Sequence, residues 1–179
     1  MPIRQMTPIP ARVVQVLKNF LLAETTLIDA EENDAIVTPQ IPAANYFDYD
    51  RKLLAEFPAC TIRALSSSPV DVKPNLMGSR VDGRHRLNVM FHATIAQARD
   101  GRTLEKLMQR WANGAARVLA ILKDGLETSA DPTRWGSPNV TTEVYWTEPI
   151  TYGPESDQGD GTIVRTATLP INVRRIELR

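Results

Sequence analysis

The sequence predicts an α+β fold in which two main helices pack on one face of an antiparallel or mixed sheet, with a long C-terminal β-hairpin. Three patterns support this prediction. Apolar and polar residues alternate over Arg84–Gln97, as in a strand with one buried face. Apolar residues recur at helical spacing over Leu104–Leu122, and two further alternating stretches, Val140–Trp146 and Thr162–Leu178, follow. Helical stripes need a sheet face on which to pack, so these elements fit a two-layer domain.

The elements of the first half of the chain follow from apolar runs and breakers. A broad apolar arc predicts a helix at Val13–Ala23, and prolines make Thr38–Tyr49 an irregular connection. A short helical turn is expected at Arg51–Glu56. An aromatic-proline pair then introduces a strand at Ala59–Leu65. Serines, prolines and glycines predict a loop over Ser66–Gly83.

The second helix has signals at both ends. Asp100-Gly101 predicts a turn, Thr103 is a plausible N-cap, and Asp124-Gly125 resembles a glycine stop. Shared strand parity or helical phase predicts a core of Leu87, Val89, Phe91, Ile95, Leu104, Leu107, Met108, Trp111, Val118, Leu119, Leu122, Val144, Leu169 and Ile171.

The last two strands form the long hairpin, and Gly153–Gly161 is its acidic tip. In the final strand the apolar parity changes at Arg174-Arg175, which predicts a bulge or a change of partner there. A lone domain would leave Ile176, Leu178 and the strand edge poorly covered. We therefore expect the segment 174–179 to pack on a neighbouring subunit or a neck protein.

Composition indicates one soluble domain of 179 residues, with 21 basic and 21 acidic residues. This balance excludes a global field that recruits nucleic acid or membrane, and it leaves a local charged patch open. Arginine outnumbers lysine, which suits ion pairs at protein interfaces. A single cysteine excludes an intramolecular disulfide. The sequence shows no secretory signal and no apolar run long enough to span a membrane. We therefore expect the newly made protein to be in the cytoplasm.

The sequence offers no catalytic, cofactor-binding or metal-binding residues. His85 and His92 have opposite parity in one strand and cannot share a metal, so they are predicted to be ordinary surface or edge histidines. Cys60 is predicted to be a buried structural thiol. Phosphate loops and nucleophile elbows are missing, and the acidic tip lacks the glutamate of a calcium loop. Arg80, Arg84 and Arg86 lack the aromatic neighbours of a single-strand-binding surface and favour a solvated face or a subunit interface.

The order of elements resembles one family, the tail terminator proteins of long-tailed bacteriophages, also called minor tail or head-tail joining proteins. The resemblance covers most of the chain beyond residue 10. It rests on the first helix, the strand entry Phe57-Pro58-Ala59-Cys60-Thr61-Ile62, the alternating strand Arg86–Ala93, the helix Leu104–Leu122 and the final hairpin. The acidic insert Gly153–Gly161 departs from the pattern.

The resemblance implies a structural virion protein rather than an enzyme. It would form a ring, typically a hexamer, at the tail-neck junction, assembled in the host cytoplasm. Its partners would be further copies of itself, the tail tube protein and a neck or head-completion protein, with DNA only passing through the channel. The residues expected at interfaces are Arg84, Arg86, Glu155, Asp157, Asp160, Arg174, Arg175, Ile176 and Leu178.

Two alternatives stay open. One is another neck or tail-tube-related adaptor, which would share the fold class and ring symmetry. The other is a small-molecule-binding or catalytic α+β domain, which would need a convergent polar pocket with perturbed titratable groups.

Overall fold

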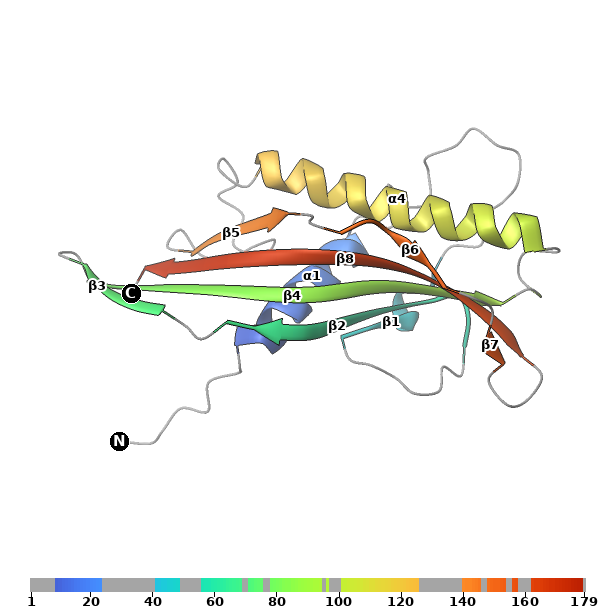
Figure 1. The fold of residues 1–179 in the computed structure, drawn as a ribbon, viewed down its shortest axis with the longest axis horizontal. Coiled ribbons are helices and arrows are strands. Elements are labelled where there is room, and N and C mark those ends of the chain that lie inside the picture. The colour runs from blue at the N-terminus through green and yellow to red at the C-terminus, as the bar shows by residue number, and fades with distance from the viewer. Residues whose placement is uncertain are drawn as a thin grey trace.

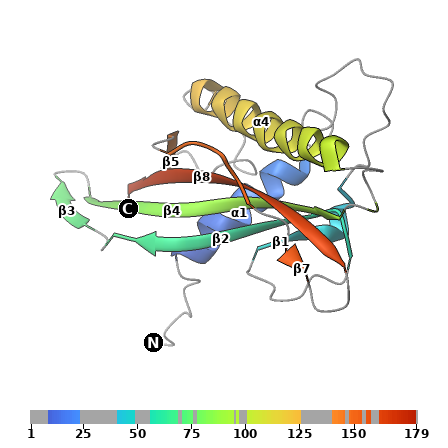
Figure 2. The same cartoon turned by 45° about the vertical axis from the view of Figure 1, so that its right-hand side comes forward.

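The chain forms a mixed sheet with a long helix packed on it, which confirms the α+β class. The computed structural model describes residues 9–23, 41–48, 56–68, 71–75, 78–94, 96, 101–125, 140–145, 148–153, 156–157 and 162–178. The long helix, α4 (Gly101–Gly125), lies along the two longest strands in both views of the ribbon (Figures 1 and 2). A shorter helix, α1 (Ile9–Ala23), contacts the strands at the beginning of the sheet.

Within the described residues the sheet has eight strands, with a main order of β1-β2-β4-β8-β5. Strand β1 runs parallel to β2, and the other pairs are antiparallel. A 3-10 turn, η1, precedes β1. The bounds are η1 (Ala43–Asn45), β1 (Tyr46–Phe47), β2 (Ala59–Ser67), β3 (Asp71–Asn75), β4 (Gly78–Thr94), β5 (Val140–Tyr145), β6 (Thr151–Tyr152), β7 (Ser156–Asp157) and β8 (Ile163–Leu178).

Strands β4 and β8 are the two longest strands and lie next to each other within the sheet. Their register runs without a shift from Arg80 opposite Leu178 to Thr94 opposite Val164. On its other side β8 pairs in turn with β7, β6 and β5. Strands are thus present in both of the last two predicted stretches, although Trp146 and most of the acidic tip lie outside the described residues.

The predicted bulge or change of partner at Arg174-Arg175 is wrong. The register with β4 is continuous there, and β5 also pairs continuously, from Val140 opposite Glu177 to Tyr145 opposite Asn172. The last part of β8 is thus an interior strand with both edges paired, so the premise of an uncovered strand edge is wrong as well. Val173 is the last residue of β8 in the core cluster among those whose side chains the structure describes.

The predicted loop over Ser66–Gly83 is also wrong. Strand β2 continues to Ser67, and β3 forms a tight hairpin with the first part of β4. Pro74 is tolerated because β3 lies at the edge of the sheet, where one side of the strand needs no ladder hydrogen bond. Of the two glycines of β4, Gly83 pairs with Arg175 of β8 and Gly78 pairs with Asn75 of β3.

The helices begin slightly earlier than the sequence predicts. Helix α1 begins at Ile9, and α4 begins at Gly101, which places Thr103 inside the helix rather than at its N-cap. The end of α4 at Gly125 is as predicted. In the connection predicted to be irregular, residues 41–48 contain η1 and β1; the helical turn expected at Arg51–Glu56 lies outside the described residues except for Glu56.

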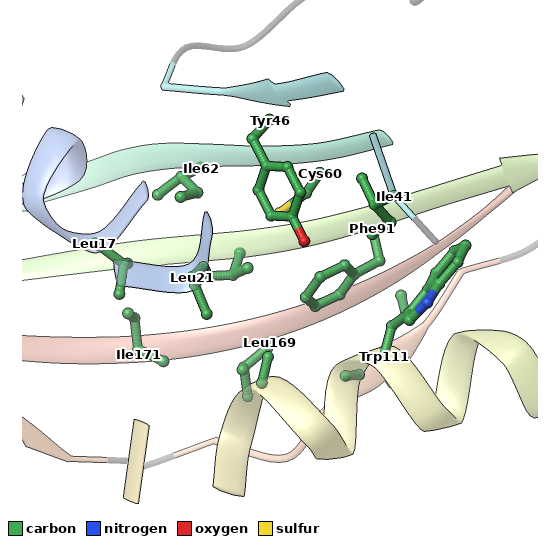
Figure 3. Packing of buried hydrophobic residues seen from close by; sticks show 14 of the residues in the cluster. Leu17, Leu21, Ile41, Tyr46, Cys60, Ile62, Phe91, Trp111, Leu169 and Ile171 are labelled. Carbon is green, nitrogen blue, oxygen red and sulfur yellow. The ribbon is translucent and has the colours of Figure 1, made fainter. Parts of the chain in front are cut away.

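One hydrophobic cluster joins the sheet and both helices, and Figure 3 shows Leu17 and Leu21 of α1 facing the same layer as Trp111 of α4. At its centre, the rings of Phe91 and Trp111 lie 6.4 Å apart between centroids. The predicted core residues confirmed as buried are Leu87, Val89, Phe91, Leu104, Leu107, Met108, Trp111, Leu119, Leu169 and Ile171. Ile95 and the side chains of Val118, Leu122 and Val144 lie outside the described part of the structure.

Candidate assembly interfaces

The sheet face that points away from the core cluster is polar along its centre. The odd-numbered residues of β4 from Leu87 to Ala93 are buried in the cluster, so strand alternation places the even-numbered residues on the opposite face. That face carries Asn88, Met90 and His92 of β4, all partly exposed. It is the face on which the predicted arginines Arg84 and Arg86 lie.

Four arginines gather at one end of this face, which we call the arginine end: Arg63 of β2, Arg84 and Arg86 of β4, and Arg174 of β8. Arg84 and Arg174 are direct register partners, and Arg63 stands opposite Asn88, one row beyond Arg86. Arg63, Arg84 and Arg86 are exposed and Arg174 is partly exposed. Two like charges directly opposite each other on a sheet are unfavourable unless anions neutralise them.

Acidic residues lie beside two of these arginines. Arg86 Nη2 lies 2.6 Å from Glu148 Oε2, in an ion pair that crosses β8, and both side chains are about half exposed. By register, Glu143 of β5 is the neighbour of Arg174 on its other side. Basic residues nevertheless outnumber acidic ones over the strand positions that pair at this end.

The adjoining edge of the sheet exposes an apolar side chain. Among the described strands, β2 has a partner on its outer side only at Cys60 and Thr61. Further along, the register of β2 against β4 shifts between Ala64 and Ser66, so Leu65 occupies a bulge and is 42 % exposed. The loop after β2 is held to β4, because Ser68 N–H donates to the Arg84 carbonyl at 2.8 Å.

The acidic hairpin end lies at the opposite end of β8 (Figures 1 and 2). Strand β7 pairs Asp157 with Ile163, and both residues are exposed, Ile163 to 40 %. Glu155 and Asp160 belong to the same segment in the sequence but lie outside the described residues. We call the group of Asp157 and Ile163 the acidic end.

The structure thus brings some predicted interface residues together and separates others. Arg84, Arg86 and Arg174 meet although they come from distant parts of the chain, whereas Asp157 lies at the far end. The backbone of Arg175, Ile176 and Leu178 belongs to β8, but their side chains are outside the description. The sequence did not predict that Arg63, Leu65, Glu148 and Ile163 would lie at these surfaces. For Leu65 alone there was a signal in the sequence, because it is an isolated leucine directly before a run of serines.

The two histidines lie on opposite faces of β4, as their spacing predicts. His92 is partly exposed and links three strands, with Nε2 2.9 Å from Thr61 Oγ1 and Nδ1 3.0 Å from Thr166 Oγ1. His85 is buried, and the prediction of a surface or edge histidine is wrong for it. Its Nδ1 lies 3.0 Å from Ser67 Oγ, and Gly83 leaves room for the ring, since a Cβ there would stand 3.1 Å from Nε2.

Cys60 is a buried thiol, as predicted. It lies between Tyr46 and Phe91 in the sheet and has no exposed surface. Burial raises the pKa of the Cys60 thiol well above its usual range, which opposes the thiolate that a nucleophile requires.

A small ionic group lies where α4 begins. Arg165 of β8 pairs with Glu105 of α4, at 3.7 Å between Nη1 and Oε2. Tyr152 of β6 is close to this group, and burial together with the Glu105 charge raises the pKa of its phenol. The pairing ties the helix to the hairpin.

The described residues contain no group of three or more histidine, cysteine, aspartate or glutamate side chains that could hold a metal ion. In the same part of the chain, no helix is long and apolar enough to cross a membrane. The comparisons with protein families and with curated proteins found no match to this chain.

Proposed function

We propose that this protein is a structural subunit of a long-tailed bacteriophage, and that it forms a ring which terminates the tail tube and joins it to the neck. The observation that carries the proposal is the order of elements on one sheet: a helix, a strand, a long strand, a long helix and a long final hairpin. This is the element order on which the resemblance to tail terminator proteins rests. The finer arrangement proposed is two helices on one sheet face with a long C-terminal hairpin.

The character of the described surface supports a structural subunit. On the sheet face that points away from the core cluster, His92 of β4 contacts Thr61 of β2 and Thr166 of β8. The buried Cys60 thiol is held in its neutral form, because burial raises its pKa. Charged and apolar side chains are instead exposed at the two ends of the sheet. Surfaces of this kind suit contacts between protein subunits.

The experiment adds the purified protein to tail tubes polymerised from the tube protein of the same phage, followed by negative-stain electron microscopy. The expected result is a cap at one end of each tube and an arrest of tube growth. Tubes incubated without the protein supply the control. Decoration along the whole tube would favour a tube-related adaptor, and a protein that leaves both the ends and the growth of the tubes unchanged would refute the proposal.

A further inference from the structure

We draw no further inference here: the strongest candidate, the outer edge of β2 around the exposed Leu65, carries none, because nothing in the structure shows what covers it.

Discussion

Phe91 and Trp111 offer the sharpest test of how the long helix is held on the sheet. Both side chains are fully buried, and their rings lie 6.4 Å apart with an interplanar angle of 39°. The register neighbours of Phe91 are Cys60 and Ala167, which are small, so no large side chain beside it in the sheet can fill the space that its loss would open. Phe91→Ala should therefore lower the free energy of unfolding by about 3–5 kcal/mol.

A double-mutant cycle separates the energy of the contact between the Phe91 and Trp111 rings from the stability that each side chain contributes by being buried. The single changes Phe91→Leu and Trp111→Leu remove the rings and keep an apolar, though smaller, side chain at each position. Comparison with the double variant should give a coupling of about 0.5–1.5 kcal/mol for the tilted ring pair. The assay is urea unfolding at a protein concentration at which the chain is monomeric. Leu65→Ala is the control, and because Leu65 is exposed it should change stability by no more than about 0.5 kcal/mol.

The result that refutes the reasoning is specific. If Phe91→Ala lowers stability by less than about 1 kcal/mol with an unchanged denaturant slope, the ring is not buried under α4. A coupling energy near zero would show that Phe91 and Trp111 are not in contact, even if each residue is important by itself.

Three further predictions follow from the described contacts. Deletion of residues 174–179 should unfold or strongly destabilise the chain, because β8 is paired on both sides there; a truncated protein that melts like the full chain in circular dichroism would contradict the register. The Cys60 thiol should react with Ellman's reagent at pH 8 only as fast as the protein opens, since burial raises its pKa; rapid labelling of the folded protein would disprove its burial. Tyr152 should ionise above the ordinary phenol pKa of 10.0, and Glu105→Gln should lower its pKa in an ultraviolet titration. Because the pKa of Tyr152 is raised in the folded state, its contribution to the free energy of unfolding is fully present at a pH below the pKa of the phenol in the unfolded chain. That contribution is lost as the pH rises through the pKa of the phenol in the folded chain. A Tyr152 titration that Glu105→Gln leaves unchanged would exclude the Glu105 carboxylate as a cause of the raised pKa.

The sequence by itself determined the elements whose periodicity is long and unambiguous. Alternation around Phe91 specified the buried face of β4, and the helical stripe through Trp111 specified the face of α4 that packs on it. These patterns are local, since each residue's direction follows from the geometry of its own strand or helix. The buried state of Cys60 followed in the same way from its place within an apolar strand.

The tertiary structure alone decided which segments pair. Pairing between β3 and β4, and of β4 with β8 from Arg80 on, made strands of a stretch that contains several breakers. The same sheet buried His85 in its interior. Sequence periodicity carries no register between distant strands, so it could not show that Arg84 meets Arg174 or that the end of β8 is covered on both sides. The candidate interfaces lie at these places because a sheet brings distant residues together through pairing, and pairing is a property of two strands rather than of either sequence.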